Sequence, residues 1–384
     1  MTHYKMSDVA VEVNDRENNP ASSKYDRFVG LEHYVSGEVI IRNYGSTENL
    51  ESTMKIFQSG DVLVARRNVY LKRASMVDFD GLTSGDSIVL RAKNPVIGRI
   101  LPFVLNTDAF WDFADQYSDG TMSKRLSPKT LMTYEFDLPD EEELEKFADL
   151  LWAANDTRES YQALLRQTDE LVKSQFIELF GDPILNEKGW PSKSIKESAV
   201  RLSDGPFGSN LKSEHYSETG VRVIRLQNIC EGYFLDDDKA YVSLEHYEKI
   251  KKYTCKSGEI IIGTLGEPNL RACIIPEYIG YAINKADCVH YIPNPEYLDT
   301  AFVVGFLNSP IVLNYALGDA HGNTRQRISS GQISKMPIII PPMELQKQYA
   351  VIIQQTDKSK FEIKKAIENT SALIKSLMQQ DLTN

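Results

Sequence analysis

The sequence contains no apolar run of the roughly 18 residues that a membrane-spanning helix needs, so we expect no membrane segment. Its first residues lack the basic and apolar regions of a signal peptide. Only four cysteines occur in 384 residues, and none forms a C-x-x-C pair, which argues against a zinc site. These absences predict a cytoplasmic, reduced protein without a metal centre.

Motifs of common enzyme classes are also missing. The sequence has no G-x-x-x-x-G-K-[ST] phosphate-binding loop and no G-x-G-x-x-G after a strand. It has no H-E-x-x-H and no G-x-S-x-G, and no two of its histidines stand at ligand spacing. The sequence therefore predicts no catalytic residue and no metal ligand.

Bases are outnumbered by acids, and the net charge is −11. Residues 139–182 hold twelve acids and four bases, which is a net of −8, so the remainder carries only −11 − (−8) = −3. The excess of acids is therefore confined to one segment. This distribution leaves room for a local basic surface elsewhere.

An internal repeat at an offset of about 200 residues is present. Residues 118–148 align with 320–350 at an offset of 202, and Arg125 falls on Arg327. Further upstream, FQSGDVLVAR is echoed by CKSGEIIIGT, which follows 198 residues later. The sequence therefore predicts two copies of one structural unit.

Each copy ends in a long helical pattern. Apolar and small residues between 345 and 377 alternate at spacings of four and three, which is a heptad seam. The same register applied to the first copy gives Glu143, Phe147, Leu150, Ala154, Thr157, Tyr161, Leu164, Thr168, Leu171 and Gln175. We expect the two seams to pack together as a coiled coil. The alternative is two amphipathic helices that each pack on their own domain.

A second apolar stripe lies beside the first seam, and we expect it to bind a partner protein. It consists of Leu151, Leu165, Val172 and Leu179. The predicted organisation is a first domain (1–138), a spacer helix (139–182), a second domain (183–340) and a C-terminal spacer helix (341–384).

The globular parts combine short β-branched runs with helices. We expect strands within 37–45, 60–67, 220–229, 258–266 and 336–341, and helices over 101–117 and 302–317. Each domain is therefore predicted as an α+β fold with a curved mixed sheet.

Basic and amide residues gather in short loops at the ends of these strands. Such side chains hydrogen-bond base edges and phosphates in DNA complexes. The candidate DNA-binding residues are Arg42, Asn43, Arg66, Arg67, Lys72, Lys124 and Arg125 in the first copy and Ser209, Asn210, Lys212, Arg225, Gln227, Asn228, Arg271, Arg325 and Arg327 in the second. Any one cluster is better explained as a solvated loop, but each copy contains four, and together they favour DNA binding.

Several segments resemble the DNA specificity subunit of type I restriction-modification systems. They are SDGPFGSNLKSEHYSETGVRVIRLQNI, CKSGEIIIG, RQRISSGQISKMPIIIPPMELQK and LVKSQFIELFGDP, with DRFVGLEHY and FQSGDVLVAR as a further variant. The resemblance covers residues from about 24 to 380. The first copy has no counterpart of the GPFGS loop, which leaves its DNA-contacting residues less defined.

The resemblance implies two target-recognition domains separated by two long antiparallel helices in a pseudo-twofold repeat. Each domain would read one half of a split double-stranded DNA target, and the helices would fix the gap and bind two methyltransferase subunits. Motor-nuclease subunits would complete the complex. S-adenosylmethionine, ATP and magnesium would belong to the partner subunits, and this chain would hold no cofactor and catalyse nothing.

Three other functions are weighed against this one. The chain could be the specificity portion of a type II restriction enzyme, although no methyltransferase or nuclease segment accompanies it. It could be a protein-interaction scaffold built on the helices, but the basic loops favour a DNA role. An enzyme with an unrecognised site is the third alternative.

Overall fold

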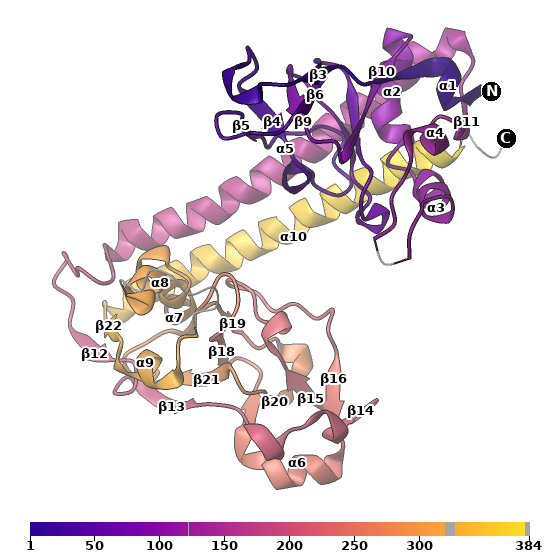
Figure 1. Cartoon of the computed structure of the whole chain (residues 1–384). Helices are drawn as coiled ribbons and strands as arrows, with labels where there is room; N and C mark the ends of the chain where they lie inside the picture. The colour runs from indigo at the N-terminus through magenta and orange to yellow at the C-terminus, as the bar shows by residue number, and fades with distance from the viewer. Residues whose placement is uncertain (122, 319–326, 381–384) are drawn as a thin grey trace. The chain divides into compact units, whose positions relative to one another are not determined.

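The chain folds into two compact units. The computed structural model describes residues 1–121, 123–318 and 327–380 (Figure 1). Unit 1 comprises residues 1–163 and 363–384, and unit 2 comprises residues 164–362. The two long helices α5 (Glu141–Phe180) and α10 (Met343–Gln380) therefore each contribute residues to both units.

Unit 1 contains three small sheets. One is the antiparallel pair β1–β11, one has the order β2-β10-β7-β8, and one has the order β3-β6-β9-β4-β5. The strands are β1 (Thr2–Lys5), β2 (Ala10–Val13), β3 (Arg16–Glu17), β4 (Arg27–Val29), β5 (Gly45–Ser46), β6 (Met54–Phe57), β7 (Val62–Ala65), β8 (Ala74–Met76), β9 (Gly81–Thr83), β10 (Ser87–Ala92) and β11 (Glu135–Leu138). The helices besides α5 are α1 (Met6–Val9), α2 (Pro95–Val104), α3 (Asp108–Gln116) and α4 (Pro128–Leu131).

Unit 2 is built in the same way. Its sheets are the pair β12–β22, the order β13-β21-β18-β19 and the order β14-β16-β15-β20-β17. The strands are β12 (Ser192–Ser194), β13 (Ala199–Ser203), β14 (Tyr216–Ser217), β15 (Val221–Ile224), β16 (Ala240–Val242), β17 (Thr254–Lys256), β18 (Ile260–Gly263), β19 (Ala272–Ile274), β20 (Tyr281–Asn284), β21 (Cys288–Pro293) and β22 (Pro337–Ile339). The helices besides α10 are α6 (Leu244–Ile250), α7 (Thr300–Leu307), α8 (Pro310–Leu317) and α9 (Ser330–Lys335).

The internal repeat predicted from the sequence is present in the fold. The two four-stranded sheets have the same topology. In unit 1, β10 pairs antiparallel with β2 and β7, and in unit 2, β21 pairs antiparallel with β13 and β18. Both five-stranded sheets contain one parallel pair, β4 with β9 and β15 with β20. The units therefore share the α+β architecture expected from the sequence.

The core of each unit lies between its four-stranded sheet and its helices. The central strands β7 and β18 are continuous apolar runs that are buried on both faces, so they show no alternation of polar and apolar residues. Helices α2, α3 and the start of α5 contribute to the core of unit 1. The end of α5, the start of α10 and helices α7, α8 and α9 contribute to that of unit 2.

Three local predictions require correction. Each of the helices expected over 101–117 and 302–317 is two helices, because Thr107 caps a new helix in the first and Pro310 begins one in the second. Residues 37–44 form no regular strand, and β5 begins only at Gly45. Ile40 makes only an isolated bridge to Met76, although the backbone there exchanges two hydrogen bonds with β8.

Apolar helices in the described ranges are short. No single one is long and apolar enough to cross a membrane. Only α7 and α8 taken together reach that length and composition, and they are bent by 59° at the break between them.

Within unit 2 the two long helices lie side by side and antiparallel. The rings of Phe176 and Tyr349 are 5.4 Å apart between centroids, and Asp169 forms an ion pair with Lys360 further along. Residue numbers rise along α5 while those of its partners fall along α10. In unit 1, Met378 of α10 is likewise buried in the core that contains the start of α5.

The seam predicted for α5 is buried at only two of its ten positions. Phe147 and Ala154 are buried, but Leu150, Leu164 and Leu171 are about half exposed. The stripe assigned to a partner is the one that packs inward instead. Leu151 is fully buried, Leu165 is half-buried, and Val172 and Leu179 pack against the core of unit 2. The assignment of this stripe to a partner is therefore wrong, because the helix is rotated by one residue.

Cysteine labelling offers a direct check on the fold of unit 2. Cys255, Cys273 and Cys288 are fully buried, and burial raises the pKa of the Cys273 and Cys288 thiols to about 12. Since the thiolate is the reactive form, we expect iodoacetamide at pH 8 to modify only Cys230 in the native protein. Mass spectrometry after labelling in denaturant should find all four modified. Rapid native labelling of Cys273 or Cys288 would contradict this packing.

Candidate DNA interface

Loops that lie far apart in the sequence meet in unit 2. Thr264 donates its amide to the carbonyl of Asp287 (2.9 Å), and Ile328 donates to the carbonyl of Thr264 (3.1 Å). Lys285 donates in the same way to Ile224 (2.9 Å). We call this set of loops the unit 2 loop edge; it comprises residues 204–212, 225–228, 264–271, 284–287 and 327–329.

Arg327 lies on this edge. Its guanidinium is 2.7 Å from the Asp287 carboxylate and 5.6 Å from the centre of the Phe207 ring, and its side chain is 46% exposed. Phe207 belongs to the GPFGS loop, where Gly205 has no room for a Cβ because backbone carbonyls of 284–285 lie 2.3 Å from that position. The loop identified in the sequence is thus seated beside Arg327. Arg325 lies outside the described residues.

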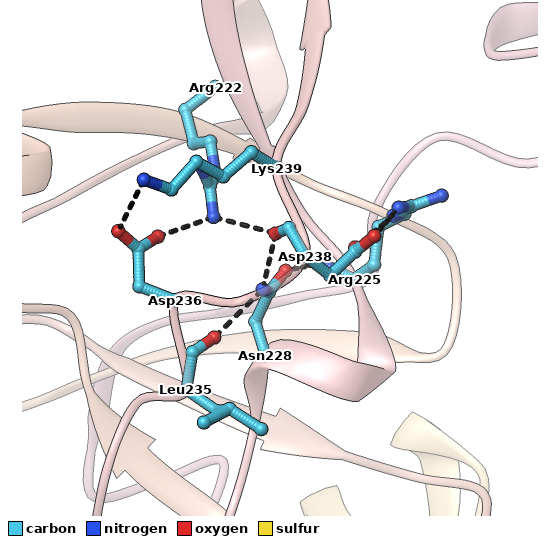
Figure 2. A network of polar contacts seen from close by, with 7 residues as sticks. All are labelled: Arg222, Arg225, Asn228, Leu235, Asp236, Asp238 and Lys239. Carbon is cyan, nitrogen blue, oxygen red and sulfur yellow. Dashed lines mark hydrogen bonds and ion pairs between the residues drawn. The ribbon is translucent and has the colours of Figure 1, made fainter. Parts of the chain in front are cut away.

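A polar network fixes the position of Arg225 (Figure 2). Arg225 forms two hydrogen bonds to the Asp238 carboxylate, while Arg222 donates to Asp236 (2.6 Å) and to the carbonyl of Asp238 (2.7 Å). Asn228 donates to that same carbonyl (2.8 Å) and is fully buried. This burial contradicts the prediction that Asn228 contacts DNA, and Arg225 is available only if it leaves Asp238.

Arg271 is also occupied by the protein itself. Its guanidinium donates to the backbone carbonyls of Leu226, Ile229, Leu265 and Pro268 at 2.6–3.0 Å. Almost all of its donors are therefore used to hold loops together. The geometry argues against direct contact between Arg271 and a base.

The remaining candidates of unit 2 lie on the loop edge with their side chains exposed. They are Ser209, Asn210, Lys212 and Gln227. The loop that carries the first three is anchored by its backbone, since the carbonyl of Asn210 shares a 2.8 Å hydrogen bond with Nε2 of His246. These side chains have the freedom that a contact with DNA requires.

Unit 1 has an equivalent loop edge, consisting of residues 30–33, 66–73, 84–87 and 123–126. Arg66 donates its amide to the carbonyl of Asp86 (2.9 Å), and Leu126 donates to the carbonyl of Arg66 (2.9 Å). These are the same two hydrogen bonds that Thr264 makes in unit 2. The repeat therefore extends to the backbone of the candidate site.

Two arginines pair with one carboxylate on the unit 1 loop edge, and Arg66 beside them donates its side chain to the carbonyl of Leu126. Arg125 lies 2.6 Å and Arg67 3.3 Å from Asp86, and the backbones of these two arginines form an isolated bridge. Burial and the charge of Arg125 lower the pKa of the Arg66 guanidinium. The structure thus brings together three residues that the sequence singled out, with more positive than negative charge.

The other candidates of unit 1 are on the surface and are mostly paired. Arg42 contacts Asp78 (2.9 Å) and Glu159 of α5 (3.0 Å), whereas Asn43 is exposed. Lys72 and Lys124 form ion pairs with Asp108 and Asp115, respectively, on α3. Exposed pairs of this kind contribute little to stability, so they do not prevent the cations from binding phosphate.

Aromatic residues at the loop edges were missed by the sequence analysis. Tyr70 is 66% exposed and lies between Arg67 and Lys72, and Phe207 is 43% exposed. An aromatic residue flanked by basic ones in a loop is the signal that identifies Tyr70, whereas Phe207 has no basic neighbour in the sequence. Aromatic side chains stack on unpaired bases or wedge between base pairs. Among the residues that the structure describes, no group of three or more metal-ligating side chains occurs.

Comparison with known families agrees with this geometry. Residues 209–370 match the model of the type I restriction modification DNA specificity domain. The type I restriction enzyme MjaIX specificity subunit of Methanocaldococcus jannaschii is 22% identical over 338 residues, which cover 82% of this chain and 74% of that protein.

Two solved structures share the fold. One is a chain of a structure described as the structural basis underlying complex assembly and conformational transition of the type I R-M system. It has a TM-score of 0.54 and 19% identity, and the match covers 99% of this chain and 96% of that one. The other is the type I restriction-modification S subunit of M. genitalium, with a TM-score of 0.53 and 13% identity over 99% and 95%. Residues 209–370 therefore match a type I restriction-modification DNA specificity domain, and the chain as a whole shares the fold of these two structures.

Proposed function

We propose that each unit reads one half of a bipartite double-stranded DNA target through its loop edge. The observation that carries this proposal is the repeated ion pair: Arg125 with Asp86 in unit 1 and Arg327 with Asp287 in unit 2. In each unit, the loops that carry the pair are joined by the same two backbone hydrogen bonds, those of Arg66 or of Thr264. Within the described part of the chain, each of these half-exposed arginines pairs with one carboxylate, and such an arginine can exchange that carboxylate for a phosphate.

The aspartates have a specific part in this proposal. In the free protein they neutralise the arginines and hold them in place, so little entropy is lost when DNA arrives. They also weaken binding to arbitrary DNA, because every phosphate must compete with a carboxylate. The net charge of −11 does not conflict with this role, because −8 of it lies within residues 139–182, outside both loop edges.

The first test concerns the unit 2 pair. We expect Arg327→Ala to weaken binding to target DNA and to reduce the slope of log K against log salt by about one, because one phosphate contact is lost. Asp287→Asn should strengthen binding to non-target DNA. Titration at several salt concentrations measures both.

Lys196 provides the control for this test. It is an exposed cation of unit 2 that lies outside the loop edge, so Lys196→Ala should leave affinity and slope unchanged. Unaltered affinity of Arg327→Ala would remove Arg327 from the interface.

We infer that the long helices bind methyltransferase subunits through the leucines that remain exposed on α5. Leu164 and Leu171 are 44% and 52% exposed, and they lie seven residues apart on a face next to the buried stripe, rotated from it by about 100°. Leu150 continues the same spacing and is 48% exposed. Exposed leucines in register on a helix are typical of a protein-binding face. In this proposal, S-adenosylmethionine, ATP and magnesium are held by partner subunits.

A double substitution separates this face from the DNA site. Leu164→Gln with Leu171→Gln should abolish copurification with the methyltransferase subunit, because two apolar contacts are replaced by amides that the interface cannot pair. Leu185→Gln is the matched control, since Leu185 is 71% exposed but follows the end of α5. Equal copurification of the double variant and the control would refute the assignment.

The helices are further proposed to set the gap between the two half-sites. Inserting seven residues into α5 after Ser160 and seven into α10 after Glu362 keeps the heptad register and lengthens each helix by about 10 Å, or roughly three base pairs. We expect the methylated sequence to keep both halves and to gain about three base pairs between them. Methylation mapping on a randomised plasmid library measures the gap, and an unchanged gap would show that the helices do not determine it.

A further inference from the structure

Arg73 and Arg271 occupy equivalent places in the two units. Each closes the loop that follows a central strand. The carbonyl of Arg73 accepts the amide of Ala65 at the end of β7 (2.9 Å), and the carbonyl of Arg271 accepts the amide of Gly263 at the end of β18 (2.8 Å). Both strand ends border a loop edge. Arg73 stands 198 residues before Arg271, which is the offset of the surrounding repeat.

The two side chains have two contacts in common, and Arg271 makes two more. In unit 1, Arg73 donates to the carbonyls of Leu31 (2.8 Å) and Arg67 (3.2 Å). In unit 2, Arg271 donates to Leu226 (3.0 Å) and Leu265 (3.0 Å), which are the equivalent positions. Leu31 and Leu226 each begin a short 3₁₀ turn after the parallel strand β4 or β15. Each arginine therefore joins two separate loops of its loop edge.

Arginine is chemically suited to this task. Its planar guanidinium carries five N–H donors and can serve several carbonyls at once, whereas the donors of lysine all lie on one atom. In unit 2 the space for the group depends on Gly266, where a Cβ would lie 2.8 Å from Nη1 of Arg271. A positive charge alone would not reproduce these contacts.

The loops that the arginines hold are strained. Asn68 and Lys72 adopt left-handed backbone conformations, with φ of 55° and 47°, and Leu270 does so in unit 2, with φ of 59°. Residues other than glycine keep such conformations only where the surroundings enforce them. A loop of this kind needs an anchor on its inner side.

We propose that Arg73 and Arg271 are positioning residues for DNA recognition. Each locks the loop after its central strand, 66–73 or 264–271, to the turn after its parallel strand, and neither touches DNA. This inference rests on the proposed function and deepens it, because it assigns two of the basic residues of the loop edges to the geometry of recognition and not to charge.

The test uses the complete complex with methyltransferase subunits. The variants are Arg73→Lys and Arg271→Lys, which keep the charge but lose the multiple contacts. Methylation rates are measured on a DNA library randomised across both half-sites. We expect Arg73→Lys to reduce discrimination on the order of tenfold at the half read by unit 1 and to leave the other half unchanged, because one well-placed base contact gives about that selectivity. Arg271→Lys should show the reverse pattern.

Controls distinguish this proposal from simpler explanations. Arg99→Lys, at an exposed pair with Asp149 away from the loops, should behave like the wild type. A uniform loss of rate on all sequences, or unchanged discrimination at both halves, would overturn the positioning role. Absence of bipartite methylation by the wild-type complex would instead refute the proposed function, so the two failures are distinguishable.

Hydrogen exchange provides a measurement that does not depend on a variant. The amides of Asn68, Leu71 and Lys72 are all hydrogen-bonded to backbone carbonyls at 2.9–3.0 Å. If the loop is held in advance, these amides should be protected in the wild-type complex before DNA is added. Exchange at unprotected rates would overturn the proposal even if the lysine variants failed to assemble.

Discussion

The candidate interface of each unit depends on one backbone junction at the end of its central strand. In unit 1, the amide of Arg66 donates to the carbonyl of Asp86, and its carbonyl accepts from Leu126. Thr264 makes the same junction in unit 2. Two hydrogen bonds at one residue bring together three loops from distant parts of the sequence. The charged side chains of these three loops take their positions from this junction, which tolerates variation in the side chains because only backbone atoms take part.

Electrostatics at the loop edges follow a common rule. Arginines that face outward are held by carboxylates, as Arg327 is by Asp287, whereas arginines that face inward are held by carbonyls, as Arg271 is. The first kind can exchange its partner for a phosphate. The second cannot leave without exposing buried carbonyls, and this would cost more than a surface pair is worth. Residue type alone does not distinguish the two kinds, but their contacts do.

The sequence analysis located the candidate site better than it assigned roles within it. Repeats and strand ends identified loops that the structure brings together, since turn and strand signals are local. The role of Asn228 was wrong because its burial depends on residues 235–238, which no local pattern connects to it. The stripe on α5 was displaced by one residue for a similar reason: adjacent heptad stripes are both apolar, and only packing against the cores decides which one faces inward.

The sequence by itself determined the duplication, the α+β class, the two long helices and the loops that carry basic residues. These properties follow from composition and periodicity, which act over a few residues at a time. Only the tertiary structure decided which arginines are free to meet a phosphate and which leucines remain exposed on α5. Those properties depend on the distance between residues far apart in the chain, and a hydrogen bond or a buried contact exists only when that distance is a few ångströms.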